Sequence, residues 1–346
     1  NFPQGKVYEG YKNKIYQKES IDGIKVIRVW SYIVPNCGFI KRTLDYISFS
    51  ITAFIAGLFI KTDIIIATSP QFFVALTGRA LSRVKRHPWI MEVRDLWPES
   101  IKTVGAMNDN VIIRYFEWQE KRCYNSATKI IVVTDSFKRT LINRGINSNK
   151  IEVIKNGVNT TLFTPREKDQ ILLNSLNLKG KKVIGYIGTH GLAHKLDFVL
   201  NCAKSLESYK DIHFLLIGDG ATKAQLLKLK EDLKCKNVTM LPSVSKNEVA
   251  RYISILDVCL INLKKSQLFK TVIPSKIFEN AGMQKPILMG VEGEAKDIIE
   301  SYGAGICFEP ENEFDFKAKL FQILEPQVYN DCKKGCKKIT EDFDRK

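Results

Sequence analysis

The sequence predicts an α/β fold with two successive domains, each built around an open parallel sheet that is flanked by helices. The length of 346 residues exceeds what one ordinary hydrophobic core holds. Short apolar runs rich in Val and Ile alternate with longer segments of helical period, which is typical of β-α-β units. This alternation stops near residue 156 and then starts again. We therefore expect two Rossmann-like domains, with the carboxyl ends of both sheets facing a shared cleft.

The first domain is predicted over residues 1–155. Its continuous apolar runs indicate strands that are covered on both faces, joined by right-handed crossover helices. Its first residues lack the usual opening strand, glycine turn and helix, so we expect that unit to be missing from this part of the chain. The predicted strands are 63–70, 88–93, 129–134 and 151–154, and the predicted helices are 71–86, 109–126 and 136–145.

The apolar segment 44–60 needs separate treatment because it follows Lys41 and Arg42. It contains Asp45 and several hydroxyl residues, and it is shorter than the ~20 residues that a membrane-spanning helix needs. We expect a buried helix of the first domain. The alternative is a helix that lies in the plane of a membrane, with the basic residues at its flank.

The second domain is predicted over residues 167–325, after a linker at 156–166 that contains Asn156, Gly157 and Pro165. A terminal helix at 326–346 could cross back to the first domain. The predicted strands are 183–187, 213–217, 238–241, 258–261 and 286–289, and the predicted helices are 195–208, 222–234, 246–254, 275–283, 295–302, 313–324 and 327–340.

The formal net charge of +16 favours partners that carry negative charge. The basic residues are spread along the chain, which fits either a solvated surface or a surface that meets anionic lipid. The eight cysteines are scattered and form no C-x-x-C pair, so we expect free thiols in a reducing compartment. No signal peptide is recognisable. We therefore expect a cytoplasmic protein.

The segment 270–279 is the most informative one for chemistry. Pro274 is suited to the first turn of a helix, but Ile273 before it offers no capping oxygen, and Lys276 places a cation at the positive end of the helix dipole. A bound anion would compensate for both features, because the amides of Ser275 and Lys276 can hold a phosphate. Glu279 shares their helical face and can accept both hydroxyls of a ribose. The alternative is an ordinary helix start.

A second candidate is the glycine-containing turn that follows the strand 183–187. Its backbone can approach a diphosphate closely, although its glycine spacing matches neither a P-loop nor the dinucleotide fingerprint. His190 is either a contact to the sugar or phosphate or a simple turn residue, and Lys195 is the nearest cation or a solvated helix residue. The ligand contacts expected at this turn are Gly188, Thr189, His190, Gly191 and Lys195.

Three further residues follow strands at the edge where a ligand is expected. Gly218 ends the strand 213–217 and either lines the site or only makes a tight turn. Arg94 and Asp95 follow the strand 88–93. Arg94 can reach a phosphate and Asp95 can orient or deprotonate an acceptor hydroxyl, unless the two only organise their loop.

A metal site is not expected. The Asp342-x-Asp344 pair lies on a helical segment and not at a strand tip. We therefore expect amides, helix dipoles and lysines to balance the charge of a nucleotide diphosphate, with no cofactor.

Together these motifs resemble family 4 of the retaining GT-B glycosyltransferases, over nearly the whole chain. The resemblance is to the bacterial subgroup that builds O-antigen and capsule and includes N-acetyl-fucosamine transferases. It is carried by the Glu-x-Arg-Asp-Leu-Trp-Pro-Glu-Ser block from Glu92, the Asn-Gly-Val from Asn156, the Gly-Thr-His-Gly-Leu-Ala turn from Gly188, and the Pro-Ser-Lys-x-Phe-Glu block from Pro274.

The resemblance implies roles for individual residues. Glu279 corresponds to the second glutamate of the family's paired signature, which holds the ribose, and Ser275 and Lys276 correspond to donor-phosphate contacts. Asp95 corresponds to the cleft residue of the first domain, next to Arg94, where many relatives have histidine. Two departures are visible: Thr271 stands where the wider family has its first glutamate, and the basic pair after the glycine turn is absent except for Lys195.

The function implied is retaining transfer of a sugar from a nucleotide-sugar to a membrane-associated saccharide. A UDP-linked N-acetylamino sugar is the expected donor, and a polyprenyl-diphosphate-linked saccharide at the inner face of the cytoplasmic membrane is the expected acceptor. Retention without an evident nucleophile favours same-face attack, with Arg94, Asp95 and Lys276 as the catalytic residues. The alternatives are a UDP-sugar epimerase of the same shape and a nucleic-acid-binding protein, although no basic-aromatic pattern or binding module supports the latter.

Overall fold

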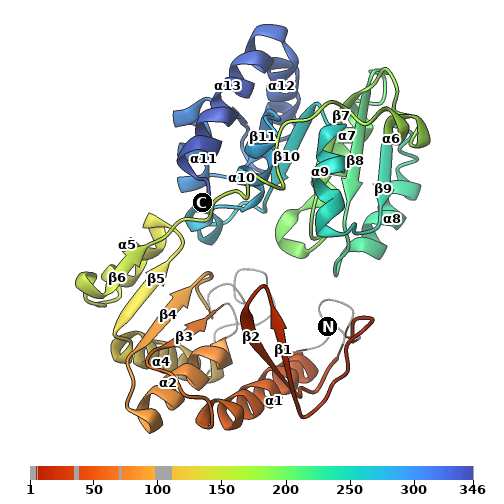
Figure 1. Ribbon diagram of the computed structural model, residues 1–346. Coiled ribbons are helices and arrows are strands. Elements are labelled where there is room, and N and C mark those ends of the chain that lie inside the picture. The colour runs from red at the N-terminus through yellow and green to blue at the C-terminus, as the bar shows by residue number, and fades with distance from the viewer. Residues whose placement is uncertain (1–4, 6, 35–38, 70–71, 98–110, 346) are drawn as a thin grey trace. The chain divides into compact units, whose positions relative to one another are not determined.

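The computed structural model describes residues 5, 7–34, 39–69, 72–97 and 111–345 (Figure 1). They belong to two compact units, Asn1–Ile154 and Lys155–Lys346. In both units the strands of an open parallel sheet alternate with helices. This arrangement accounts for the continuous apolar runs in the sequence, because parallel strands are covered on both faces. The predicted linker at 156–166 falls within the second unit.

The first unit contains four parallel strands in the order β3-β4-β5-β6. Its helices α1, α2 and α4 form one layer, since α2 packs against both of the others (Figure 1). The strands are β3 (Ile65–Thr68), β4 (Trp89–Val93), β5 (Lys129–Val132) and β6 (Ile151–Val153). The helices are α1 (Phe39–Leu58), α2 (Phe72–Lys85), α4 (Val111–Ser126) and α5 (Asp135–Asn143).

A hairpin that the sequence analysis missed precedes α1. Its strands β1 (Tyr16–Ile21) and β2 (Ile24–Val29) pair antiparallel. The two residues between them, Asp22 and Gly23, have φ of 51° and 80°, which is the backbone that a two-residue hairpin turn needs. The Asp-Gly dipeptide is the signal that predicts such a turn.

The expectation that segment 44–60 is a buried helix is wrong in one respect. The helix forms as α1, but none of its described side chains is buried. One side of α1 packs on α2 and another side contacts the segment after β2, which leaves a face uncovered. Among the described helices, none has the length and apolar character to cross a membrane.

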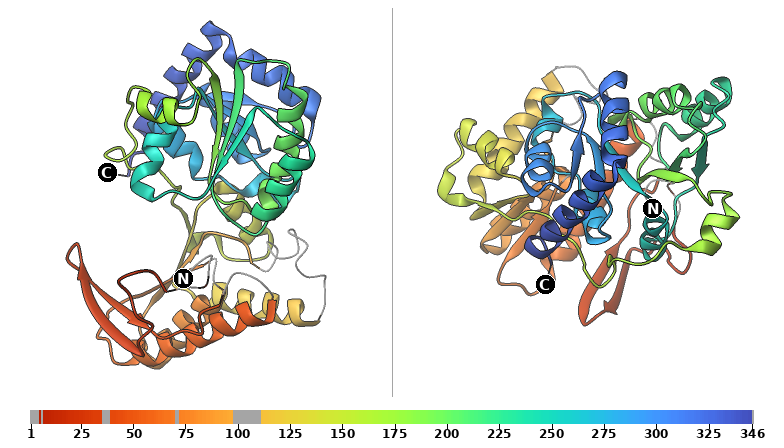
Figure 2. Two further views of the ribbon diagram at one scale, coloured as in Figure 1. Left: turned by 90° about the vertical axis from the view of Figure 1, so that its right-hand side faces the viewer. Right: turned by 90° about the horizontal axis from the view of Figure 1, so that it is seen from above.

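The second unit contains six parallel strands in the order β12-β11-β10-β7-β8-β9, with helices on both faces (Figure 2). The strands are β7 (Lys182–Ile187), β8 (Ile212–Ile217), β9 (Val238–Leu241), β10 (Val258–Asn262), β11 (Ile287–Gly290) and β12 (Gly305–Cys307). The helices are α6 (Gln170–Ser175), α7 (Leu196–Ser205), α8 (Lys223–Asp232), α9 (Lys246–Ser254), α10 (Lys276–Gly282), α11 (Glu294–Tyr302), α12 (Glu313–Leu324) and α13 (Pro326–Asp342).

Each face of this sheet has its own apolar core. Along β8, Leu215 and Ile217 belong to the core that includes residues of α9, α10 and α11, whereas Phe214 and Leu216 belong to the core of α7, α8 and α12. This alternation follows from the two-residue period of a strand. Each core contains side chains of both strands and helices. The packing therefore fixes the positions of the strand ends that carry the loops.

The end of the second unit returns to its beginning. The amide of Val158 donates to the carbonyl of Phe343 at 2.8 Å, and the amide of Arg345 donates to the carbonyl of Val158 at 3.0 Å. The hydroxyl of Thr160 donates to the carboxylate of Asp344 at 3.0 Å. Helix α13 packs against α10, α11 and α12. Its predicted return to the first domain stays a prediction.

The described cysteines are unpaired, and all of them except the half-buried Cys307 are buried. Burial raises the pKa of Cys123 to about 11 and that of Cys202 to about 12. These thiols are therefore protonated and unreactive near neutral pH. The prediction of free thiols is confirmed for the described part of the chain. Cys37 lies outside the described residues.

Candidate functional site

The loops after β7 and β8 lie against each other in the candidate site. We call the backbone around Gly188 and Gly218, where they meet, the glycine floor. The Gly188 amide donates to the carbonyl of Ile217 and the His190 amide donates to that of Asp219, both at 2.8 Å. Gly188 and Gly218 have φ of 148° and 150°. A Cβ on Gly218 would lie 1.8 Å from the carbonyl oxygen of Gly188. The close approach of the two backbones therefore requires glycine at Gly218.

Lys276 extends from the start of α10 onto this floor. Its ammonium lies 3.9 Å from the ring centroid of Tyr186, in a cation–π contact. A Cβ on Gly188 would lie 2.2 Å from the Lys276 Nζ, so the lysine occupies the space that a side chain at Gly188 would fill. The residue is half-buried, and burial of the ammonium lowers its pKa to about 7. A bound anion would stabilise the charged form.

Tyr186 contacts both the Lys276 ammonium and the turn that follows β7. The ring is fully buried, and its hydroxyl donates to the carbonyl of Thr189 at 2.8 Å. Its centroid lies 6.0 Å from that of His190 and 5.9 Å from that of His194. Tyr186 therefore holds the glycine turn and the Lys276 side chain in one place. Burial raises its pKa, so it stays a neutral hydrogen-bond donor.

His190 is buried and neither of its ring nitrogens has a hydrogen-bond partner among the described residues. Burial first, and then the charges of Lys223 and Lys276, lower its pKa to about 4. The pKa of His194 is lowered to about 3 for the same leading reason. Both imidazoles are therefore neutral at pH 7. A buried imidazole without a partner is unfavourable, and a ligand group could supply the missing hydrogen bond.

Ser275 and Glu279 complete the set on α10. Ser275 is exposed and occupies the position before the helix, with no capping bond from its side chain. Glu279 is half-buried. Burial raises its pKa, although the charges of Lys276, Lys246 and Arg345 oppose the shift. Because Glu279 follows Lys276 by three residues, a cation and a carboxylate lie on one helical face.

The predicted residue Lys195 has a different environment from Lys276. Its ammonium pairs with the carboxylate of Asp197 at 2.7 Å, and this hydrogen bond raises its pKa. Its backbone has φ of 48°, which places it in the left-handed region just before α7. Gly191 precedes it in the same loop. The structure thus brings Lys276, and not Lys195, to the glycine floor.

Two residues at this edge were missed by the sequence analysis. Lys223, at the start of α8, donates to the carbonyl of Leu241 at 2.7 Å, and burial lowers its pKa. Asn262, at the end of β10, donates to the carbonyl of His194 at 2.9 Å, while its own side-chain oxygen has no partner among the described residues. Asn262 is the only polar residue of its strand. A polar residue at a strand end was the available signal.

Arg94 and Asp95 follow β4 in the first unit, as predicted. The Arg94 amide lies 3.4 Å from the hydroxyl oxygen of Ser69, and Leu96 is buried. Trp97 stacks on Phe72 with ring centroids 4.6 Å apart. These contacts hold the loop against α2. The remaining residues of the block, 98–100, lie outside the described residues.

The described residues contain no group of three potential metal ligands. The carboxylate of Asp342 accepts from the hydroxyl of Tyr302 at 2.6 Å, and that of Asp344 accepts from Thr160. Both aspartates therefore have structural roles. That the reaction needs no metal stays a prediction.

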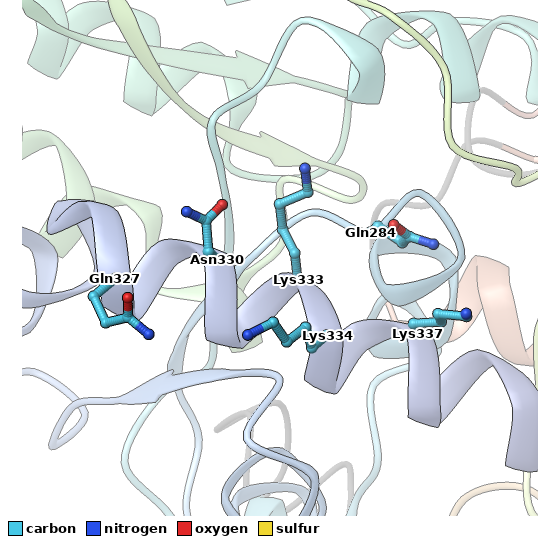
Figure 3. A pocket seen from close by; sticks show the side chains of 6 residues that line it. All are labelled: Gln284, Gln327, Asn330, Lys333, Lys334 and Lys337. Carbon is cyan, nitrogen blue, oxygen red and sulfur yellow. The ribbon is translucent and has the colours of Figure 1, made fainter.

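An open depression of about 470 Å³ lies along α13 (Figure 3). Its lysines include Lys334, which pairs with Asp331 at 2.9 Å. None of the candidate site residues lines it, and we assign it no role. The lining residues are Gln284, Gln327, Asn330, Lys333, Lys334 and Lys337.

Comparison with known families identifies the class of protein. The family model described as glycosyl transferases group 1 matches residues 167–339, half of the chain. A second model, described as glycosyltransferase family 4, matches residues 7–162. The chain belongs to the glycosyl transferases group 1 and is a glycosyltransferase. This result favours a transferase over the epimerase and the nucleic-acid-binding protein.

The curated relatives have low sequence identity to this chain, but their alignments cover more than half of it. The chain is 23% identical over 335 residues to the putative colanic acid biosynthesis glycosyl transferase WcaI of Escherichia coli, covering 93% of this chain and 82% of the relative. It is 22% identical over 269 residues to the probable glycosyltransferase WbjE of Pseudomonas aeruginosa, covering 77% and 67%. It is 26% identical over 204 residues to the putative teichuronic acid biosynthesis glycosyltransferase TuaH of Bacillus subtilis, covering 58% and 49%.

Solved structures show the same fold. The Anabaena protein HepE, crystallised with UDP-glucose, has a TM-score of 0.72 at 15% identity over 86% of this chain and 78% of that chain. Sucrose-phosphate synthase from Thermosynechococcus elongatus has a TM-score of 0.76 at 14% identity over 99% and 83%. The chain therefore has the GT-B architecture of two Rossmann-like α/β domains, which confirms the predicted fold class.

Proposed function

We propose that this glycosyltransferase takes a UDP-linked sugar, of the N-acetylamino class, as its donor and transfers it with retention during the synthesis of a surface polysaccharide such as O-antigen or capsule. The observation that carries the donor proposal is the ammonium of Lys276, held over Tyr186 at the glycine floor. The complex of HepE with UDP-glucose supports a uridine donor for a protein of this fold. The relatives named for colanic and teichuronic acid synthesis support the polysaccharide.

The proposed donor site lies on the second unit. The backbone of Gly188, Thr189 and Gly191 would lie along the diphosphate, and Lys276 would neutralise it. Glu279 would accept the ribose hydroxyls. His190 would meet the sugar or the β-phosphate with a neutral nitrogen. Ser275, Lys195 and Gly218 are further predicted contacts.

The proposed reaction proceeds on one face of the sugar. The bond between the anomeric carbon and the phosphate oxygen breaks, and the acceptor oxygen bonds to the same carbon from the same side. The acceptor proton passes to the departing diphosphate, whose developing charge Lys276 stabilises. Asp95 would orient the acceptor hydroxyl and Arg94 would approach the phosphates. Domain closure would bring these two residues to the donor.

The proposed acceptor is a saccharide linked to a polyprenyl diphosphate at the inner face of the cytoplasmic membrane. Such an acceptor carries negative charge and is anchored in lipid. A net charge of +16 favours an enzyme that works against an anionic surface. We therefore propose a cytoplasmic protein that binds the membrane peripherally.

Thermal-shift measurements with UDP, GDP, ADP and CMP, without added metal, test the donor proposal. We expect UDP alone to stabilise the protein, since a ligand that binds only the folded state raises the melting temperature. Glu279→Ala should lose this shift. Glu231→Ala, which removes an exposed glutamate of α8, is the matched control and should keep it. Stabilisation by another nucleotide, or an unchanged shift in Glu279→Ala, would contradict the proposal.

A further inference from the structure

Lys223, the first residue of α8, places a second ammonium group beside the glycine floor. Its Nζ donates to the carbonyl oxygen of Leu241 at 2.7 Å. The amide of Gly218 donates to the same oxygen at 3.2 Å. Two donors that share one acceptor lie close together, so the Lys223 ammonium lies next to Gly218. The Lys276 ammonium lies beside Gly188, the other glycine of the floor.

Backbone contacts hold the start of α8 against the turn after β7. The amide of His190 donates to the carbonyl of Asp219 at 2.8 Å. The carbonyl of His190 accepts from the amide of Thr222 at 3.0 Å and from its hydroxyl at 2.8 Å. A Cβ on Gly220 would lie 2.5 Å from that carbonyl oxygen. The packed loops therefore fix the point from which the Lys223 side chain extends.

The contact with Leu241 does not by itself account for a lysine at this position. The Leu241 carbonyl already accepts from the Gly218 amide, so it would keep a partner without the ammonium. An ammonium has three N–H donors. Among the described residues, the half-buried Lys223 makes one hydrogen bond and no ion pair. Its other donors are available to a ligand.

Lys223 and Lys276 occupy the same unfavourable position in their helices. Each is the first residue of its helix, α8 or α10, and so places a cation at the positive end of a helix dipole. Neither helix has a side-chain capping bond at its start. Burial lowers the pKa of both ammonium groups. A bound anion would compensate for the cation at the dipole and would stabilise the charged form.

His190 lies near both lysines. After burial, the charges of Lys223 and Lys276 are the next causes that lower its pKa. The ring is buried, and neither nitrogen has a hydrogen-bond partner among the described residues. The charge of Asp219 opposes these shifts, and its carboxylate accepts from the amide of Gly220 at 2.7 Å. Two cations and an unpartnered neutral imidazole therefore border the floor, which fits a ligand with several anionic oxygens.

We infer that Lys223 is a second phosphate-binding residue of the donor site, and that Lys223 and Lys276 hold a nucleoside diphosphate from the two sides of the glycine floor. A diphosphate carries more than one negative charge and extends over two phosphate groups, so two separated cations match it better than one. The inference rests on the proposed function, because the floor is the place that we assign to the donor. It adds a residue that the sequence motifs do not contain.

Isothermal titration of the full chain with UDP, at about pH 6 where both lysines are charged, tests this inference. Lys223→Met should raise the Kd by about tenfold or more, because a hydrogen bond to a charged group is lost. Lys223→Gln keeps a donor for the Leu241 carbonyl without the charge and should weaken binding similarly. Lys223→Arg keeps a cation and should retain most of the affinity. Binding of uridine, followed by ligand-observed NMR, should be the same in all of these proteins, because uridine has no phosphate.

Lys228→Met is the matched control, since it removes an exposed lysine of the same helix. It should bind UDP like the unchanged protein. The melting temperature of each free protein reports whether the fold is intact. Equal loss of UDP and uridine binding would assign Lys223 to the support of the loops alone and overturn the inference, and so would unchanged UDP affinity in Lys223→Met and Lys223→Gln. Absence of UDP binding by the unchanged protein would instead overturn the proposed donor and this inference together.

Discussion

Raising the pH above about 7 should weaken the binding of a UDP-sugar. The reason is that Lys276 then loses the positive charge that we propose neutralises the diphosphate. Burial lowers the pKa of this ammonium in the free protein to about 7. A bound diphosphate favours the protonated form and raises the pKa in the complex. Between these two pKa values, binding takes up a proton, so the affinity falls as the pH rises.

The size of the effect follows from the contact that is lost. A hydrogen bond to a charged group contributes about 1.5–3 kcal/mol, which corresponds to a change of about ten- to hundredfold in Kd. The Kd should be constant below the pKa of the free protein. Above it, the Kd should rise by up to about tenfold for each pH unit until that limit is reached.

Isothermal titration with UDP-glucose, from about pH 6 to pH 9, measures this dependence. Lys276→Met should bind weakly at every pH, with no slope. Lys204→Met is the matched control, because the Lys204 ammonium pairs with Glu207 at 2.6 Å on α7 and not at the glycine floor. A slope that survives in Lys276→Met would refute the reasoning. So would full affinity in that variant at about pH 6.

Four further outcomes are expected. Asp95→Asn should abolish sugar transfer and keep the UDP thermal shift, since the proposed donor contacts come from the second unit; loss of both would place Asp95 in donor binding. Phe316→Ala should lower the free energy of unfolding by about 3–5 kcal/mol in urea denaturation, because the buried ring packs on three others. Gly185→Ala should cost about 1–3 kcal/mol, since its Cβ would lie 2.3 Å from the methyl carbons of Leu256; an unchanged stability would show that Leu256 moves freely. EDTA should leave the transfer rate unchanged, and recovery of a lost rate by added Mg²⁺ would contradict the metal-free proposal.

Most strands of both sheets could be predicted because a parallel strand covered on both faces is an unbroken apolar run. Strands such as β8 and β10 stand out for this reason. The missed elements lack this signal. Strand β12 has three residues and α6 has six, which is too short for a period to be visible. The β1–β2 hairpin carries mixed polar residues and is marked only by Asp22-Gly23.

The candidate site was predictable in its parts and not in its assembly. The lack of a capping oxygen at Ile273 pointed to Ser275 and Lys276, but the structure begins α10 at Lys276 and places Ser275 in the capping position, where its side chain makes no capping bond. The sequence does not reveal that the Lys276 side chain reaches Tyr186 or that Lys195 pairs with Asp197. Such contacts depend on how the loops fold back over the strand ends. Burial of His190 likewise follows from the neighbouring loop, which no local pattern encodes.

Because Val158 pairs with the residues around Asp344, the first and last segments of the second unit lie side by side. Joining these two ends and opening the chain at a surface loop, such as the turn at Lys234, should produce a circular permutant that still folds. Such a permutant could then be fused to the first unit of another transferase. Exchange of whole second units between transferases would then show whether the proposed donor site moves with this unit.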